Sequence, residues 1–399
     1  MNSAGILTRK PSRISDCIVV GGGVIGLLTA YELAQEGLRV TVVERGHRTA
    51  GAASWASGGV LAPLYPWRIR PALLPLLNWS QARYPQLALE LVACSGVDPE
   101  WLQSGLLILE PALWKELADV EGTFPCDWQL LDQGSLKSLE PGVDAGEHGA
   151  LWFPQAAQIR SPRLLRALNL SLAQKGVTQL AAQVQQILSD KGKAAGVITH
   201  DSRLYAPIVV VAAGAWSGSV LGSLGEGFEL RPICGQMLLI AAKSGLVRHV
   251  LVQRDHYLIP RRDGHVLVGS TLENAGFNNA VTAEAREALT TSAWSMYPRI
   301  RNYPIVTQWS GLRPGSPEGI PWIGAHPELT GLYLSTGHYR NGISLAPASA
   351  RLLADLIFQR PPVVEPLAYD PARASQAYGQ RAPAGSNTKP LSTASHYYN

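Results

Sequence analysis

A glycine turn near the N-terminus constrains the fold more than any other part of this chain. Residues 21–26 read GGGVIG, so Gly21, Gly23 and Gly26 fit the pattern G-x-G-x-x-G. In this pattern the first glycine permits a tight turn, the second lets the backbone approach a pyrophosphate, and the third lets a helix pack closely on a strand. A glycine turn kept only for packing is the alternative.

The residues around this turn favour the nucleotide-binding interpretation. An apolar strand is predicted at 17–20, a helix at 24–36, and a second strand at 39–44 that ends on Glu44. A helix that starts at the turn directs its free N–H groups at the phosphates, and Glu44 is placed to accept from a ribose hydroxyl. We therefore predict a doubly wound, Rossmann-like domain that binds a dinucleotide.

Composition excludes several other classes of protein. The formal net charge is only +4 over 399 residues, which is too weak for a nucleic-acid-binding protein. The cysteines are far apart, so no zinc site is predicted, and reduced thiols favour a cytoplasmic location. They are Cys17, Cys94, Cys126 and Cys234.

Two apolar segments could suggest membrane targeting, and neither has the required form. Basic residues at 9–13 precede an apolar run at 17–30, but three consecutive glycines interrupt that run, which disfavours a signal peptide. The uncharged stretch 204–225 has a densely apolar part only at 208–213, far short of the roughly 20 residues that cross a bilayer. No integral membrane segment is predicted.

The rest of the chain divides by its periodicity. Residues 67–170 are predicted to be mostly helical, and 230–310 to form an antiparallel sheet. Helices are expected at 80–94, 162–175, 283–297 and 346–358, and strands within 177–211 and at 236–241, 256–260 and 265–270.

Two arginines near the C-terminus form a candidate anion site. Arg313 lies in GLRPGSPEGIPWIG at 311–324, and Arg340 lies in GHYRNG at 337–342. A guanidinium binds a carboxylate or phosphate through a planar fork of donors, and the surrounding glycines allow close approach of the backbone. A dinucleotide cradle at one end and an anion clamp at the other indicate one enzyme built from both ends of the chain.

Several motifs in a fixed order then point to a known family. Residues 16–370 resemble the glycine oxidase branch of the D-amino-acid oxidase superfamily, whose members bind FAD. The similarity rests on GGGVIG, VVERG at 42–46, VVVAAGAWSG at 209–218, YLIPRRDGHVLVGST at 257–271, GLRPG at 311–315 and GHYRNG followed by Leu345-Ala346-Pro347.

The resemblance implies a set of residues that bind FAD. The pyrophosphate would meet the turn, Glu44 and Arg45 would lie around the adenosine, residues at 53–60 would line the ribityl chain and flavin, and the stretch 338–344 would surround the pyrimidine end. The full implied set is Gly21, Gly23, Val24, Ile25, Gly26, Glu44, Arg45, Ala53, Ser54, Gly58, Gly59, Val60, Val184, Gly214, His338, Tyr339, Arg340, Asn341, Gly342, Ile343 and Ser344. No cysteine falls at the position used for covalent flavin in sarcosine-oxidase relatives, so the FAD is expected to be noncovalent.

The resemblance also implies that Arg313 and Tyr257 bind the substrate carboxylate, with Arg340 at a further substrate-side position. A structural salt bridge for Arg313 and a packed ring for Tyr257 are the alternatives, and Arg340 could instead support the flavin or its loop. No catalytic side chain is predicted, because hydride transfer to flavin N5 needs no base if the amine arrives neutral. His256 and His338 are accordingly expected to be structural, and no metal is expected.

The predicted fold class is thus mixed α+β and α/β, with a Rossmann-like FAD domain and an antiparallel-sheet substrate domain. The FAD domain is assigned to 16–80, 150–220 and 310–370, the substrate domain to 81–149 and 221–309, and flexible tails to 1–15 and 371–399.

The expected reaction is oxidative deamination of glycine or another small amine, with O2 as electron acceptor. The resemblance further implies supply of the glycine imine for thiamine thiazole synthesis, and a homo-oligomer, a tetramer in the family. Two alternatives stay open: a dehydrogenase of D-amino acids or sarcosine that passes electrons to a quinone or carrier, and a non-catalytic FAD-binding partner protein. Cys234 and Ser344 depart from the family pattern, and Ser344 leaves the substrate preference open.

Overall fold

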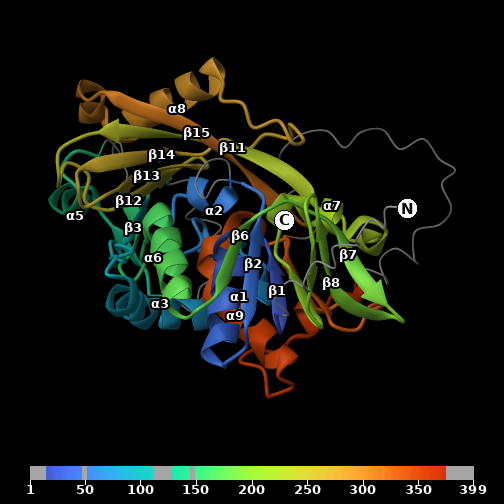
Figure 1. The fold of residues 1–399 in the computed structure, drawn as a ribbon. Helices are drawn as coiled ribbons and strands as arrows, with labels where there is room; N and C mark the ends of the chain where they lie inside the picture. Colours follow the sequence, from blue (N-terminus) through green and yellow to red (C-terminus); the bar gives the residue numbers. More distant parts are fainter. Residues whose placement is uncertain (1–14, 47–51, 111–126, 144–148, 318, 374–399) are drawn as a thin grey trace, which may run out of the picture.

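The computed structural model describes residues 15–46, 52–110, 127–143, 149–317 and 319–373. Nearly all of both predicted tails, 1–15 and 371–399, lies outside these ranges, as does Cys126. Figure 1 shows two main layers of sheet, with α6 beside the lower sheet and α8 above the upper one.

The lower layer is a six-stranded sheet with the order β16-β17-β10-β1-β2-β6. All neighbouring pairs are parallel except β16 with β17. The strands are β1 (Cys17–Val20), β2 (Val40–Glu44), β6 (Thr178–Ala181), β10 (Ile208–Val211), β16 (Trp322–Ala325) and β17 (Leu332–Thr336). Since β1 lies between β2 and β10, their carboxyl ends meet at one edge, where doubly wound sheets bind ligands.

Both faces of this sheet are covered, because residues alternate along each strand. Cys17 and Val19 of β1 pack into the core under the helices α1 (Val24–Gln35), α3 (Leu74–Ser95), α6 (Ser161–Gln174) and α9 (Gly342–Ile357). Ile18 and Val20 pack on the opposite side. That side is covered by a three-stranded sheet of β7 (Val184–Asp190), β8 (Lys193–Thr199) and β9 (Arg203–Tyr205), and by α7 (Ser217–Leu221).

The upper layer is an eight-stranded sheet with the order β15-β11-β14-β13-β12-β3-β5-β4. Its outer face packs on α8 (Ala283–Met296), and its inner face is directed at the short helix α2 (Ala53–Ala56), which lies between the layers (Figure 1). The strands are β3 (Leu106–Ile108), β4 (Gln129–Leu131), β5 (Ala150–Phe153), β11 (Arg231–Ala241), β12 (Val250–Gln253), β13 (His256–Pro260), β14 (His265–Gly269) and β15 (Ile305–Gly315).

Short elements complete the described chain. They are α5 (Gln133–Leu139) and the 3-10 helices η1 (Pro66–Arg68), η2 (Pro71–Leu73), η4 (Gly214–Trp216), η5 (Gly222–Gly225), η6 (Pro298–Asn302), η7 (Tyr339–Asn341) and η8 (Leu367–Tyr369). Within the described residues, none of the helices has both the length and the apolar character needed to cross a bilayer.

The predicted fold class is confirmed, while the expectation for 67–170 is wrong in part. β3, β4 and β5 lie in this range, and each is only three or four residues long. Such short runs carry too little periodicity to be recognised, and β3 gains its two partners from β5 and from β12, both far along the chain. The predicted domain boundaries stay a prediction.

The last helix also begins earlier than expected. We predicted 346–358, whereas α9 starts at Gly342 and contains Pro347. A proline there cannot donate to the carbonyl of Ile343. The hydroxyl of Tyr84 on α3 donates to that carbonyl instead, and Ser80 Oγ accepts from the N–H of Ala348 at 3.0 Å. Packing against α3 therefore allows a helical turn that the sequence alone disfavours.

Candidate active site

The glycine turn has the geometry that a pyrophosphate cradle needs. Gly21 has a φ of +117°, and a Cβ there would lie 2.3 Å from the carbonyl oxygen of Ala212. A Cβ on Gly26 would lie 2.0 Å from the carbonyl oxygen of Gly21, so the third glycine is required for packing of α1 on β1. Gly23, the N-cap of α1, has no side-chain cap, and among the residues that the structure describes only Ser54 Oγ lies near its Cβ position, at 3.2 Å. The backbone of Gly23 is thus left accessible beside the helix N-terminus, which suits a phosphate.

Glu44 holds this turn in place. Its carboxylate accepts from the N–H of Gly22 at 2.6 Å and from the N–H of Gly46 at 3.0 Å. Each carboxylate oxygen has a second lone pair, so these bonds leave acceptor capacity for a ribose hydroxyl. Next to it, the guanidinium of Arg45 lies 3.5 Å from the centroid of the Trp216 ring.

Trp216 was not among the residues predicted from the sequence. It lies in η4, which follows β10. Strands β10 and β2 lie on either side of β1, so the fold brings Trp216 near Arg45 at the end of β2. Gly214, two residues before it, has a φ of +56°, and no atom of the described residues lies within 4 Å of its Cβ position. Val184, by contrast, is buried at the start of β7 in the core on the far side of the six-stranded sheet.

The segment predicted to line the flavin lies beside the turn. Ser54 on α2 accepts from the N–H of Val24, the first residue of α1, at 3.0 Å. Gly59 has a φ of +72°, and a Cβ there would lie 2.0 Å from the carbonyl oxygen of Ile159. Helix α2 in turn rests on β15, where Trp309 donates to the carbonyl of Ala56 at 3.1 Å. These contacts place residues 53–60 between the two layers.

Arg313 and Tyr257 share the inner face of the eight-stranded sheet. Tyr257 pairs with Gly269, Gly269 with Met237, and Met237 with Trp309. Paired residues of adjacent strands point to the same face, and so do residues two positions apart on one strand. Arg313 lies four positions after Trp309 on β15 and therefore points to the face that carries the Tyr257 ring.

The guanidinium of Arg313 is fixed by neutral groups. Nη2 donates to Ser270 Oγ at 2.7 Å and Nη1 to the carbonyl of Thr271 at 3.2 Å. A Cβ on Gly235 would lie 2.0 Å from Nη1, so the guanidinium occupies space that only glycine leaves free. Within the ranges that the structure describes, Arg313 forms no ion pair, so the alternative of a structural salt bridge has no support there. The remaining donors can receive a carboxylate.

Tyr257 is nearly buried, with its ring between two glycines. Cβ atoms on Gly58 and Gly269 would lie 3.2 Å and 2.6 Å from its Cε2 atom. Among the described residues its hydroxyl has no hydrogen-bond partner, which leaves this group available to a ligand. Glycine inside a strand often marks a place where another group approaches closely. Gly235 and Gly269 are such glycines, so they could have indicated the close packing of Arg313 and Tyr257.

The stretch 338–344 is joined to the strand that carries Arg313. His338 and Gly315 form an isolated antiparallel bridge, and η7 and α9 follow directly. The guanidinium of Arg340 lies 5.6 Å from the Tyr339 ring centroid. Ser344 Oγ donates to the carbonyl of Asn341 at 3.0 Å, which accounts for a hydroxyl at this position without a ligand.

Neither histidine considered for acid–base work is suited to it. His338 is 2% exposed, its Nε2 contacts Ser349 Oγ at 3.0 Å, and burial lowers its pKa to about 3. Burial also lowers the pKa of His256. Cys234 lies on the opposite face of the sheet from Arg313, and its pKa is raised by burial. Within the described residues, no group of histidine, cysteine and carboxylate side chains could hold a metal ion.

Comparison with known proteins identifies the family. The model of the family named FAD dependent oxidoreductase matches residues 16–356. This chain belongs to that family. The predicted FAD cofactor is thereby confirmed, and the accessible backbone at Gly23 and Gly214 fits it.

Individual relatives show which members of the family this chain resembles in sequence and structure. A glycine oxidase of Pseudomonas aeruginosa is 45% identical over 365 residues, which cover 89% of this chain and 98% of the relative. A bifunctional protein ThiO/ThiG of Nostoc sp. is 33% identical over 86% of this chain, which spans 53% of that protein. The crystal structure of glycine oxidase from Geobacillus kaustophilus superposes with a TM-score of 0.83 at 30% identity, covering 90% of this chain and 98% of that one.

Proposed function

We propose that this protein catalyses the FAD-dependent oxidative deamination of glycine and other small amines such as sarcosine and small D-amino acids. The products are the 2-oxo acid, hydrogen peroxide and ammonia, with methylamine in place of ammonia when the substrate is sarcosine. The observation that carries the proposal is the Arg313 guanidinium, fixed by Ser270 and Thr271 on the sheet face that also presents the Tyr257 hydroxyl. The similarity to glycine oxidases over nearly the whole chain supports it.

Arg313 and Tyr257 orient the substrate. The guanidinium receives the carboxylate through a charge-assisted fork, and the Tyr257 hydroxyl donates to the same group. A small amino acid has little apolar surface, so these contacts must supply most of its orientation. Gly58, where a Cβ would lie 3.2 Å from the Tyr257 ring, belongs to the segment that we assign to the flavin. The carboxylate clamp and the cofactor segment thus meet at Tyr257, and Arg340 is assigned to the substrate side.

The glycine turn 21–26 and the segment 53–60 would hold FAD, which would supply the acceptor for a hydride from the amino acid Cα and the electrons for reduction of O2. The chain itself need not remove a proton if the amine arrives neutral, and burial, which lowers the pKa of both histidines, makes them weaker bases. The amine must therefore arrive unprotonated, and the resulting imine hydrolyses to the 2-oxo acid and ammonia. Positioning of reacting groups, which can lower a barrier by roughly 7–11 kcal/mol, is the contribution of the protein.

Three further assignments belong to this proposal. Supply of the glycine imine to thiamine thiazole synthesis is supported by the ThiO/ThiG relative. A cytoplasmic location is supported by the free thiols of Cys17, Cys94 and Cys234. A homo-oligomer, a tetramer by family resemblance, rests on that resemblance alone.

Anaerobic reduction of the purified flavoprotein tests the function. Glycine, sarcosine, D-alanine and D-proline are mixed with it in a stopped-flow instrument, and flavin bleaching is recorded. We expect glycine or sarcosine to bleach the flavin and air to restore it with stoichiometric peroxide. Bleaching without peroxide would indicate a dehydrogenase that uses a quinone or carrier. No bleaching by any amine would indicate a non-catalytic FAD-binding protein.

A further inference from the structure

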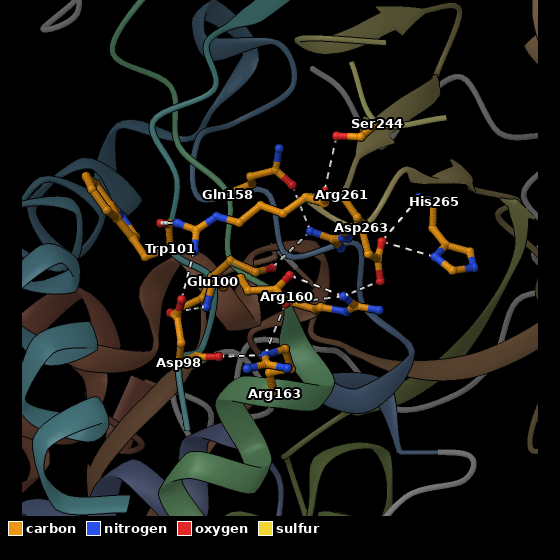
Figure 2. Close-up of polar contacts among 12 residues, drawn as sticks. Asp98, Glu100, Trp101, Gln158, Arg160, Arg163, Ser244, Arg261, Asp263 and His265 are labelled. Atoms are coloured by element: carbon orange, nitrogen blue, oxygen red, sulfur yellow. Dashed lines mark hydrogen bonds and ion pairs between the residues drawn. The ribbon is translucent and has the colours of Figure 1, made fainter. Parts of the chain in front are cut away.

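Arg261, which follows the last residue of β13, is a buried arginine that the reaction as described does not use. Its side chain is 7% exposed. Nη2 donates to the carbonyl of Gly58 at 2.7 Å, and Nη1 donates to Gln158 Oε1 at 2.8 Å and to the carbonyl of Ile159 at 3.4 Å. Figure 2 shows this guanidinium directed at Gln158. Burying a guanidinium costs free energy that its hydrogen bonds must offset.

The surrounding carboxylates are engaged with other arginines. Glu100 and Asp263 form ion pairs with Arg160 at 3.2 Å and 2.8 Å, and Asp98 pairs with Arg262 at 2.8 Å (Figure 2). In the described parts of the chain, Arg261 itself forms no ion pair and donates only to neutral oxygens. Burial and the nearby Arg160 lower its pKa to about 10, so it stays charged at neutral pH.

The oxygens that Arg261 holds belong to two segments that are joined to each other. The N–H of Ile159 donates to the carbonyl of Gly59 at 2.8 Å, and Val60 bridges to Gln158. Arg261 therefore ties both sides of this junction to the end of β13. The residues 58–60, which we assign to the flavin, form one side of it.

The same strand contacts the same turn through a substrate residue. Tyr257, Ile259 and Arg261 lie at alternate positions and share one face. A Cβ on Gly58 would lie 2.7 Å from Ile259 Cδ1 and 3.2 Å from the Tyr257 ring, while Arg261 binds the carbonyl of Gly58. One strand thus sets both the position of Tyr257 and the position of the turn.

We propose that Arg261 is a positioning residue that fixes the turn 58–60 against β13 and thereby sets the separation between bound flavin and the Tyr257 side of the carboxylate clamp. This inference rests on the proposed function. Loss of the guanidinium releases the Gly58 carbonyl and loosens the turn, while Arg313 keeps its own contacts with Ser270 and Thr271. The amino acid still binds, but its Cα no longer stands at a fixed place against the flavin.

The test compares Arg261→Met with Arg262→Met, a neighbouring control. The Arg262 side chain is 47% exposed, and among the described residues it donates hydrogen bonds only to Asp98 and the carbonyl of Trp101. In the apoprotein, hydrogen exchange of a peptide covering 57–62 should quicken at least tenfold in Arg261→Met and stay at the wild-type rate in Arg262→Met. This readout needs neither flavin nor turnover.

In the FAD-loaded protein, the limiting rate of flavin reduction by glycine should fall tenfold or more in Arg261→Met. The dissociation constant of acetate, a probe of the carboxylate clamp, should change less than threefold. Arg261→Lys, which keeps a donor within reach of the Gly58 carbonyl, should restore part of both the protection and the rate, and it decides the test if Arg261→Met fails to fold.

The proposal would be overturned if Arg261→Met kept both the wild-type hydrogen-exchange rate at 57–62 and the wild-type rate of flavin reduction. Equal effects in Arg261→Met and Arg262→Met would also overturn it, because they would indicate general destabilisation. If glycine does not reduce even the wild-type flavin, the proposed function fails, while the exchange measurement still decides the role of Arg261.

Discussion

The contact between Tyr84 and α9 gives a sharp test of how this fold accommodates a proline near the cofactor segment. Tyr84 is fully buried, and its hydroxyl donates to the carbonyl of Ile343, which Pro347 cannot reach because it has no N–H. In Tyr84→Phe this carbonyl loses that donor. An orphaned buried acceptor costs about 1–3 kcal/mol, and we expect the free energy of unfolding to fall by that amount.

Replacement of Pro347 provides a matched background in which to measure the effect of Tyr84→Phe. In Pro347→Ala the new N–H can donate to Ile343 along the helix, so the carbonyl has a partner whether or not Tyr84 has a hydroxyl. Tyr84→Phe should then cost less than about 0.5 kcal/mol, giving a coupling free energy of about 1–2 kcal/mol between the two sites. Tyr205→Phe, at a ring that is 41% exposed, serves as the control for loss of a hydroxyl alone.

Urea unfolding of the four apoproteins, followed by tryptophan fluorescence, measures this coupling. The midpoint should shift without a change in the m-value. Since Ile343 lies in the stretch assigned to the flavin, the dissociation constant of FAD should rise in Tyr84→Phe and recover in the double variant. An equal cost of Tyr84→Phe with and without Pro347 would show that the hydroxyl does not substitute for the missing N–H.

Three further predictions concern the cofactor and the site. Acid precipitation should leave FAD in the supernatant, and flavin that stays with the pellet would contradict noncovalent binding. Arg313→Ala should keep FAD but raise KM for glycine and lower kcat/KM by the equivalent of about 3–5 kcal/mol, with Arg313→Lys recovering only part, and near-normal kinetics would place the anion site elsewhere. The reduction rate should rise as pH approaches the ammonium pKa of glycine in both wild type and His256→Gln, and a hundredfold loss in the variant would identify a base.

One prediction about stability follows from the burial of His338. Its native pKa of about 3 lies below the ordinary value of 6.5, so only the unfolded chain takes up a proton between these pH values. The contribution of neutral His338 to the free energy of unfolding is present above pH 6.5 and is lost as pH falls below that value. Between pH 7.5 and 5.5 the wild type should lose about 1.4 kcal/mol more than His338→Gln, as measured by urea unfolding. An equal loss in both proteins would show that His338 is not buried neutral.

The sequence determined the features that depend on local backbone geometry. The glycine turn at 21–26 needs conformations and close approaches that only glycine allows, and Gly21 and Gly26 meet backbone oxygens in the structure as their positions in the motif required. The ends of α6 and α8 were also predicted within a residue, because a helix of 14 residues repeats its pattern several times, whereas α3 begins six residues before the predicted 80. The order of the motifs was enough to indicate FAD.

Tertiary structure decided what depends on partners far along the chain. β3 exists as a strand because β12 pairs with it, and α9 begins at Gly342 because Tyr84 and Ser80 of α3 satisfy groups around Pro347. Likewise, the sequence named Arg313 and Tyr257 as binding residues, but only the register of β13, β14, β11 and β15 puts them on one face. Trp216 and Arg261 carried no local signal, since an aromatic ring over Arg45 and a buried guanidinium on Gly58 arise from contacts between segments more than a hundred residues apart.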